Sequence, residues 1–405
     1  MNTLEQIAEI ERKYLLTTYN RYPVVLSRGK GVFLYDTEGK RHLDFVAGLG
    51  VNALGHAHPR IVKTIREQAG KLIHVSNLYY HEYQGVLAEK LCALLGSSFG
   101  SARAFFSNSG TEAIEGSIKL ARLAGHRAGG EGKCRLVALD GSYHGRTFGA
   151  LSLTGQDKHR KGFEPLLEEV SFVGRNDVEG LRAAVNDNTC AIVLEPIFGE
   201  GGIYECSVEF LQECRALADR HKAALIFDEI QCGLGRTGTI FAFQSFGVTP
   251  DIVAIAKPIA AGLPLGAFLA KEEFASAILP GQHGTTFGGG PLACRVALEF
   301  LAIVEEEKLL ENVNKVGAYL QHELQALTEK RGAAKEVRGR GFIQGIQLDI
   351  PARPIVDAAL AEGILFNSTQ DTVVRFLPPF LLEEKHVDRG VRVLKRLLGK
   401  RRKAA

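Results

Sequence analysis

Apolar residues from about residue 60 onward recur in two patterns that alternate along the chain. Helical spacing, with apolar residues three or four positions apart, marks the segments 58–72, 84–95, 112–125 and 209–222. Short runs rich in β-branched and aromatic residues lie between them, at 103–108, 134–140, 190–196, 224–229, 251–257 and 265–271. This alternation predicts a mostly parallel β-sheet covered by helices. Because only a short turn joins the last two runs, we expect the final strand to lie antiparallel to its neighbour.

Both ends of the chain depart from this alternation. The first 20 residues have helical spacing, and residues 31–45 predict a β-hairpin that turns at 37–39. After residue 306 the pattern restarts with a long helix at 311–330, and strands follow at 340–350 and 372–380. We therefore predict an α/β protein in three parts. These are an N-terminal segment that packs with the small domain (1–50), a large domain (51–306) and a small C-terminal domain (307–405).

The composition is that of an ordinary globular protein, with 45% hydrophobic and 23% charged residues among 405. A net charge of +3 is too small to indicate a nucleic-acid partner. No run approaches the roughly 18 apolar residues of a membrane span, and the N-terminus lacks the features of a signal peptide. Seven dispersed cysteines indicate free thiols in a reducing compartment. We expect a cytoplasmic protein without nucleic-acid or membrane partners.

Two short motifs are interpreted as structural. Residues 233–238 match GxGxxG, but a dinucleotide site needs that motif directly after a strand and an acid at the end of the next strand. Residues 228–232 separate the apolar run from Gly233, and Asp251 begins the next run, so we do not predict NAD binding. His56 and His58 form an HxH pair without further ligands, which favours a turn before a helix over a metal site.

The segment 105–122 passes from a predicted strand through Ser-Asn-Ser-Gly-Thr directly into a predicted helix. The free N–H groups of a helix start bind anions, phosphate above all, and Gly110 allows close backbone approach. Thr111 adds a hydroxyl donor. The alternative is that Ser109 or Thr111 is merely the N-cap of the helix. This segment by itself leaves both interpretations open.

Asp228 and Lys257 end two neighbouring apolar runs and are separated by about the length of one βαβ unit. Both side chains are therefore expected at the carboxyl ends of adjacent strands, where open α/β sheets place their ligands. A structural ion pair is the alternative, but a buried ion pair contributes little to stability. An amine beside a phosphate site can form a Schiff base, and an acid facing it can hold a pyridine nitrogen protonated. Together these residues predict pyridoxal 5′-phosphate (PLP) as cofactor.

Motifs along nearly the whole chain resemble the class III (ornithine-type) aminotransferases of PLP fold type I. They lie at 34–59, 74–82, 105–113, 141–155, 194–202, 226–238, 256–258, 283–294 and 374–380. The stretches VNALGHAHP and SNLYYHE are similar to the acetylornithine branch more than to the ornithine or 4-aminobutyrate branches. The resemblance implies a large PLP-binding domain with a mostly parallel sheet covered by helices, a smaller α/β C-terminal domain, and a homodimer with shared active sites.

The resemblance also implies the roles of individual residues. For the cofactor it assigns Gly110 and Thr111 to the phosphate, Tyr143 to stacking on the ring, Asp228 to the pyridine nitrogen, Gln231 to the ring hydroxyl, Lys257 to the covalent bond, and Thr286 to the phosphate of the partner subunit's cofactor. For the substrates it assigns Arg146 and Thr285 to a carboxylate, Arg375 to the α-carboxylate of glutamate, and Glu200 to neutralising Arg375 when glutamate is absent. Asp228 and Lys257 are the predicted catalytic residues.

The activity implied is transamination between N2-acetylornithine and 2-oxoglutarate, which yields N-acetylglutamate 5-semialdehyde and glutamate in arginine biosynthesis. Three positions depart from the family pattern: Phe198 replaces Gln, Pro258 replaces Gly and Gly290 replaces Asn. These replacements remove polar groups near the expected entrance of the substrate site. The amino donor therefore stays undecided between acetylornithine and three other ω-amino compounds, namely ornithine, succinylornithine and 4-aminobutyrate. A PLP-dependent decarboxylase or aminomutase is the alternative from another reaction class, because fold does not determine reaction.

Overall fold

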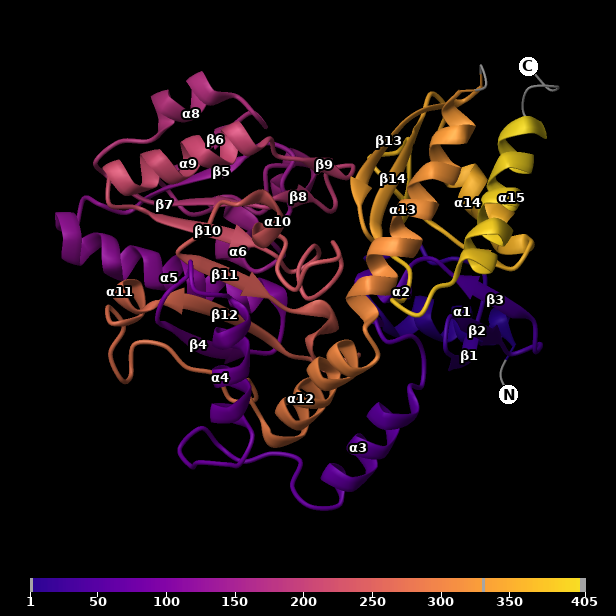
Figure 1. Ribbon diagram of the computed structural model, residues 1–405, viewed down its shortest axis with the longest axis horizontal. Coiled ribbons are helices and arrows are strands. Elements are labelled where there is room, and N and C mark those ends of the chain that lie inside the picture. Colours follow the sequence, from indigo (N-terminus) through magenta and orange to yellow (C-terminus); the bar gives the residue numbers. More distant parts are fainter. Residues whose placement is uncertain (1–2, 330–331, 401–405) are drawn as a thin grey trace.

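The computed structural model describes residues 3–329 and 332–400 (Figure 1). A large sheet with helices on both faces lies on the left of Figure 1, and a smaller sheet with its own helices lies on the right. The first strands of the chain lie below this smaller sheet, next to the C-terminal helices. Residues 401–405, which end the predicted C-terminal domain, lie outside the described residues.

The large sheet has seven strands in the order β4-β12-β11-β10-β7-β5-β6. Their bounds are β4 Ala102–Ser107, β5 Arg135–Leu139, β6 Val170–Val173, β7 Thr189–Leu194, β10 Ala224–Asp228, β11 Ile252–Ile255 and β12 Gly266–Lys271. Strand β12 pairs antiparallel with both neighbours, whereas the pairs from β11 to β6 are all parallel. The mostly parallel sheet and its one reversed strand are confirmed. Strand β6 is an addition, because its four residues were too short to stand out in the apolar pattern.

Side chains of the large sheet alternate between two apolar clusters, as the pleat of a β-strand requires. On one face Ile226 and Ile252 pack in the cluster that includes α5 (Gly110–Gly129). On the other face Phe227 and Val253 pack in the cluster that includes α4 (Gln84–Leu94), α9 (Val208–Arg220) and α12 (Pro291–Glu306). Every residue of β7, β10 and β11 is buried, which explains their continuous apolar runs.

The smaller sheet is antiparallel, in the order β13-β14-β17-β16. Its elements are β13 Ala334–Arg340, β14 Ile343–Leu348, β16 Asn367–Thr369, β17 Val373–Phe376, α13 Leu309–Thr328, α14 Arg353–Ala361 and α15 Glu384–Lys400. Strand β13 was not predicted, because its charged, glycine-containing sequence lacks an apolar run.

A third sheet joins the two ends of the chain. Strands β1 (Leu26–Lys30), β2 (Phe33–Asp36) and β3 (Arg41–Asp44) form an antiparallel meander, and β2–β3 is the predicted hairpin. Strand β15 (Ile364–Leu365) pairs parallel with β3 and completes this sheet. We propose on this basis that residues 1–50 pack with the C-terminal part. The boundaries at 50 and 306 stay predictions.

Helix α1 is shorter than the 20 residues expected. It spans Leu4–Tyr14 and ends where Leu15 adopts an extended conformation. Thr17 and Thr18 follow, and β-branched residues disfavour the helix.

The remaining elements are α2 Ala47–Gly50, α3 Pro59–Ala69, α6 Phe148–Ser152, α7 Asp157–Arg160, α8 Val178–Ala184, β8 Ile197–Phe198, β9 Tyr204–Glu205, α10 Phe243–Phe246, a 3-10 helix Lys257–Ala260 and α11 Glu272–Ala275.

Both motifs interpreted as structural have structural partners. Residues 233–238 form turns and open no helix, and the Asp251 carboxylate pairs with Arg215 and Lys271. His56 contacts Asp44 at 2.7 Å, whereas His58 faces Glu307 at 3.5 Å. The two histidines therefore contact two different carboxylates. Among the described residues, no helix combines the length and apolar character needed to cross a membrane.

Candidate active site

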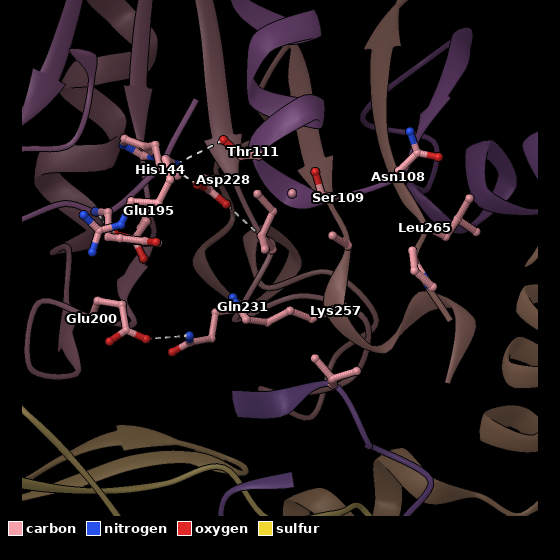
Figure 2. A pocket seen from close by; sticks show the side chains of 18 of the residues that line it. Asn108, Ser109, Thr111, His144, Glu195, Glu200, Asp228, Gln231, Lys257 and Leu265 are labelled. Atoms are coloured by element: carbon pink, nitrogen blue, oxygen red, sulfur yellow. Dashed lines mark hydrogen bonds and ion pairs between the residues drawn. The ribbon is translucent and has the colours of Figure 1, made fainter. Parts of the chain in front are cut away.

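A cavity of about 410 Å³ lies at the carboxyl ends of β10 and β11. Most of the predicted site residues line it: Gly110, Thr111, Tyr143, Arg146, Glu200, Asp228, Gln231 and Lys257. Figure 2 shows side chains from both strand ends pointing into the same space as the start of α5. This is the position at which open α/β sheets bind ligands.

The start of α5 forms one wall of the cavity. Ser109 caps the helix, since its hydroxyl accepts a hydrogen bond from the Glu112 N–H at 3.4 Å. The capping interpretation is confirmed. The N–H groups of Gly110 and Thr111 have no intrahelical acceptor and are available to an anion, and phosphate binding at this segment stays a prediction. A methyl group on Gly110 would lie 2.8 Å from Ile230, so glycine allows this close approach.

Asp228 lies at the end of β10 and faces the cavity with a buried carboxylate. Its Oδ2 contacts Nδ1 of His144 at 2.7 Å, and its Oδ1 accepts from the Ile230 N–H at 3.0 Å. Burial alone would lower the pKa of His144, but the hydrogen bond and charge of Asp228 outweigh it and raise this pKa. His144 was missed in the sequence because a lone histidine in a glycine-rich stretch carries no distinctive spacing.

Lys257 follows β11 and lies opposite Gln231 in the same cavity (Figure 2). Its backbone adopts a φ of +38°, which is unfavourable for a residue with a side chain. Burial lowers the pKa of its amine, while the carboxylates of Glu200 and Asp228 oppose this shift. A depressed pKa raises the fraction of neutral amine, the form that acts as nucleophile or base.

Glu195 is a second cavity residue that the sequence did not single out. Its two carboxylate oxygens accept hydrogen bonds from the N–H groups of Tyr143 and Gly199, each at 2.9 Å. Burial, followed by the nearby charge of Asp228, raises the pKa of Glu195 to about 7. It therefore joins the loop that carries Tyr143 to the loop that carries Glu200. An isolated Glu-Pro after a strand is too common to be noticed.

Glu200 and Arg375 form an ion pair at the other end of the cavity. Glu200 Oε1 lies 2.6 Å from Nη1 of Arg375, and Nε2 of Gln231 donates to the same oxygen at 3.3 Å. Arg375 is 1% exposed, and its guanidinium also donates to the Gly199 carbonyl at 2.8 Å and to Asn367 at 2.6 Å. Burial would raise the pKa of Glu200, but the Arg375 charge and hydrogen bond outweigh it and lower this pKa.

Three predicted residues lie outside the cavity lining. Arg375 reaches the cavity through Glu200 and Gln231. Thr285 accepts a hydrogen bond at 3.3 Å from Asn108, which does line the cavity. Thr286 is exposed and is not among the residues that line the cavity.

Comparison with known proteins places the chain in a family. The family model described as "Aminotransferase class-III" matches residues 15–398. The chain belongs to this family. The acetylornithine aminotransferase of Caldanaerobacter subterraneus subsp. tengcongensis is 45% identical over 390 residues, covering 96% of this chain and 98% of that protein. The acetylornithine aminotransferase of Aquifex aeolicus is 45% identical over 385 residues, covering 95% and 100%.

Solved structures agree with this class III aminotransferase fold. The ornithine aminotransferase of Toxoplasma gondii ME49 matches with a TM-score of 0.94 at 30% identity, covering 100% of this chain and 97% of that one. The acetylornithine aminotransferase of Elizabethkingia anophelis matches with a TM-score of 0.87 at 31% identity, covering 99% and 100%. A further structure of the T. gondii enzyme is described with partial occupancy of PLP at its active site. The predicted family and fold are confirmed.

Class III aminotransferases use PLP, and the side chains of this cavity fit that cofactor. An anion site at the start of α5, a buried carboxylate and a buried amine converge there, as a phosphate, a pyridine nitrogen and an aldehyde require. Of the three departures from the family pattern, only Pro258 adjoins one of these groups, because it follows Lys257 in the 3-10 helix. Phe198 is buried and Gly290 is the N-cap of α12 without a side-chain cap, and neither lines the cavity.

Proposed function

We propose that this protein is a PLP-dependent ω-aminotransferase that converts N2-acetylornithine and 2-oxoglutarate into N-acetylglutamate 5-semialdehyde and glutamate in arginine biosynthesis. The near-full-length similarity to acetylornithine aminotransferases supports this substrate choice. The observation that carries the proposal is the ion pair of Arg375 with Glu200 beside Lys257. It provides a cation that can be offered to one substrate and neutralised for the other.

The two donors need opposite electrostatics at one place. Glutamate reacts at its α-carbon, so its α-carboxylate lies next to the reacting carbon and requires a cation, Arg375. Acetylornithine reacts at its δ-carbon, which has only methylene neighbours, and an unpaired buried cation there would cost about 3–5 kcal/mol. Because Glu200 is 30% exposed on the cavity side, it can release Arg375 to glutamate and pair with it again for acetylornithine.

When bound, PLP supplies an aldehyde that takes up the amino group and a ring that accepts electron density from the adjacent carbon. In the proposed assignment, Gly110 and Thr111 bind the phosphate and Tyr143 packs on the ring. Asp228 holds a proton at the ring nitrogen, and the hydrogen bond from His144 fixes the orientation of its carboxylate. Lys257 would hold the resting cofactor covalently, and once released its neutral Nζ would accept the proton of the substrate carbon and pass it on to the cofactor. Gln231 orients toward the ring hydroxyl, and Arg146 and Thr285 face the distal carboxylate.

We propose that the enzyme works as a homodimer in the cytoplasm. Thr286 is exposed in one subunit, and the proposal places its hydroxyl on the cofactor phosphate of the partner. Large apolar side chains are exposed in the same part of the chain or on the neighbouring segment 72–80: Leu78, Tyr79, Tyr80 and Phe287. Sedimentation that finds an active monomer would overturn the shared site.

Seven unpaired thiols support the proposed location, because free thiols are typical of a reducing compartment such as the cytoplasm.

A donor panel tests the substrate assignment. Acetylornithine, succinylornithine, ornithine and 4-aminobutyrate are each supplied with 2-oxoglutarate, and kcat/KM is measured for each. The proposal requires the largest value for acetylornithine. A larger value for another donor would move the enzyme to that branch of the family. Release of carbon dioxide without any acceptor would instead indicate a decarboxylase.

A further inference from the structure

Arg236 is a buried cation for which the described residues supply no carboxylate partner. It is 1% exposed and belongs to the segment 233–238, which the proposed mechanism does not use. Burial lowers its pKa to about 9, and the distant charge of Asp44 only partly opposes this shift. An unpaired guanidinium is expensive to bury. Such a residue is therefore expected to do something that an apolar side chain could not.

The guanidinium of Arg236 joins three distant segments through their carbonyl groups. Nη2 donates to Gly50 O at 3.2 Å, and Nη1 donates to Pro378 O and, at 3.4 Å, to Phe342 O. Its charge also lies 4.7 Å from the centre of the Phe380 ring. The acceptors come from the N-terminal turn and from two loops beside the smaller sheet. The side chain of Arg236 thus ties the N-terminal turn and these two loops to the segment 233–238, which follows β10.

The Gly50 carbonyl belongs to the short element α2 (Ala47–Gly50), a backbone turn whose dihedral angles are not those of a right-handed helix. Four consecutive residues, Ala47 to Gly50, have φ values of 48°, 61°, 64° and 88°, so the turn is left-handed. Two of them carry side chains, and a left-handed conformation costs such residues roughly 1–2 kcal/mol each. Strain of this kind persists only where surrounding contacts enforce it.

Two groups enforce the turn from opposite ends. At its start, Oδ1 of Asp44 accepts from the N–H groups of Val46 and Ala47 at 2.8 Å and 2.9 Å. At its end, Arg236 holds the Gly50 carbonyl. Asp44 is itself fixed by His56 at 2.7 Å. Loss of either group would leave the strained residues free to relax.

The turn lies directly against Lys257. A methyl group placed on Gly50 would be 3.8 Å from Nη2 of Arg236 and 3.9 Å from Cδ of Lys257. The next residue, Val51, lines the cavity. Gly50 therefore lies between the guanidinium of Arg236 and the side chain of Lys257.

We infer that Arg236 is a positioning residue that holds the left-handed turn 47–50 against Lys257. It acts through the Gly50 carbonyl and touches neither substrate nor cofactor. The inference rests on the proposed role of Lys257, but the turn itself can be observed without catalysis.

Hydrogen–deuterium exchange of the holoenzyme tests the inference without substrate. In Arg236→Gln, the peptide covering 46–53 should exchange about tenfold faster than in wild type, while β10 and β11 keep their protection. Arg236→Lys keeps a cation and should restore part of the protection. The pH midpoint of the visible absorption band, which reports on the nitrogen of Lys257, should move in Arg236→Gln. Four other charged groups influence the pKa of this nitrogen, and the variant leaves them in place: Glu195, Glu200, Asp228 and Arg375.

Lys133→Met is the matched control. Lys133 is a second buried cation that has no carboxylate partner within the described part of the chain, and its Nζ donates to the carbonyls of Asp187, Thr189 and His221 at 2.9, 2.8 and 2.6 Å, away from the cavity. The Lys133→Met variant should have a lower Tm, with the hydrogen exchange of residues 46–53 and the pH midpoint of the visible band unchanged.

Unchanged exchange of 46–53 in folded Arg236→Gln would overturn the inference, and so would an equal increase in every peptide. If that variant does not fold, Asp44→Ala removes the opposite support and must open the same turn and move the same midpoint. Because exchange needs no turnover, a wild type without aminotransferase activity would reject the proposed function and leave this result standing.

Discussion

The two ends of the active-site cavity are built in different ways. At the phosphate end, four consecutive residues, 108–111, supply the wall, the helix start and the hydroxyl group. At the opposite end, Glu200 and Arg375 are separated by 175 positions along the chain, and Asn367 comes from another strand of the smaller sheet. The first end is a property of one strand–loop–helix segment. The second exists only when two sheets pack together.

This difference separates binding from selectivity. In the proposed mechanism, the phosphate end retains the same cofactor through both half-reactions, because its donors are backbone N–H groups at fixed positions. The same proposal requires the Glu200–Arg375 end to change its net charge between donors, and a side-chain pair from separate elements can do this without disturbing the helix. Variants should therefore act on cofactor affinity at one end and on donor preference at the other.

Lys257→Ala removes the group shared by both ends and should have the largest effect. Turnover should fall by roughly 10²–10⁴-fold with every donor, because both proton transfers use the same amine. Lys257→Arg, which keeps a cation but cannot bond to an aldehyde, should lose as much. Initial rates provide the measurement, together with a visible band that borohydride bleaches in wild type. A wild type without that band would refute PLP as cofactor.

Asp228→Asn should reduce turnover with all donors by roughly 10²–10³-fold while the fold is kept. The amide retains the shape of Asp228 but cannot hold a proton at the ring nitrogen, and it leaves His144 without its carboxylate partner. Steady-state rates and a melting curve separate the two effects. Turnover near that of wild type would remove Asp228 from its assigned role.

Thr286→Ala should act on the phosphate end alone. A hydrogen bond to a charged group contributes about 1.5–3 kcal/mol, so PLP affinity should fall roughly 10- to 150-fold. Donor preference should not change. Equilibrium dialysis gives the Kd of the cofactor, and Thr249→Ala, a threonine outside the cavity, provides the control. Unaltered affinity would contradict a shared active site.

Glu200→Ala should act on the other end alone. Arg375 then stays available, so the glutamate half-reaction holds or improves, while the acetylornithine half-reaction falls by about tenfold. This loss is smaller than the roughly 150- to 5,000-fold of a fully unpaired buried cation, because Arg375 keeps its bonds to Gly199 and Asn367. Single-turnover kinetics with each donor measure the split. Equal losses on both donors, or no loss on either, would rule out Glu200 as the gate.

The smallest expected effect is on stability at acid pH. Arg375 lowers the pKa of Glu200 in the folded protein below its ordinary value of 4.5. The pair therefore stabilises the fold above pH 4.5, and this contribution is lost as the pH falls through the lowered pKa. Melting curves of wild type and Glu200→Gln should differ by a constant amount at pH 5–7, and the gap should narrow below. A gap that widens on acidification would contradict the pairing.

The sequence pointed to the segment 108–111 and to the strand-end pair, which the structure brings to one cavity, because both depend on short-range patterns. Apolar runs that end in Asp228 and Lys257 identify two buried strands, and the order of elements makes them neighbours in a parallel sheet. By contrast, His144, Glu195 and Arg236 were missed. Each makes at least one contact with a residue more than 50 positions away, and no local spacing marks such a contact.

The sequence by itself determined the fold class, the placement of Asp228 and Lys257 at neighbouring strand ends, and the family, because hydrophobic periodicity and contiguous motifs are carried by neighbouring residues. Tertiary structure alone decided which oxygen of Glu200 meets Arg375, how Asp228 is oriented by His144, and how Arg236 holds a strained turn beside Lys257. These contacts depend on distances between elements that pack against each other. Such distances are set by the summed packing of two sheets, which no single segment encodes.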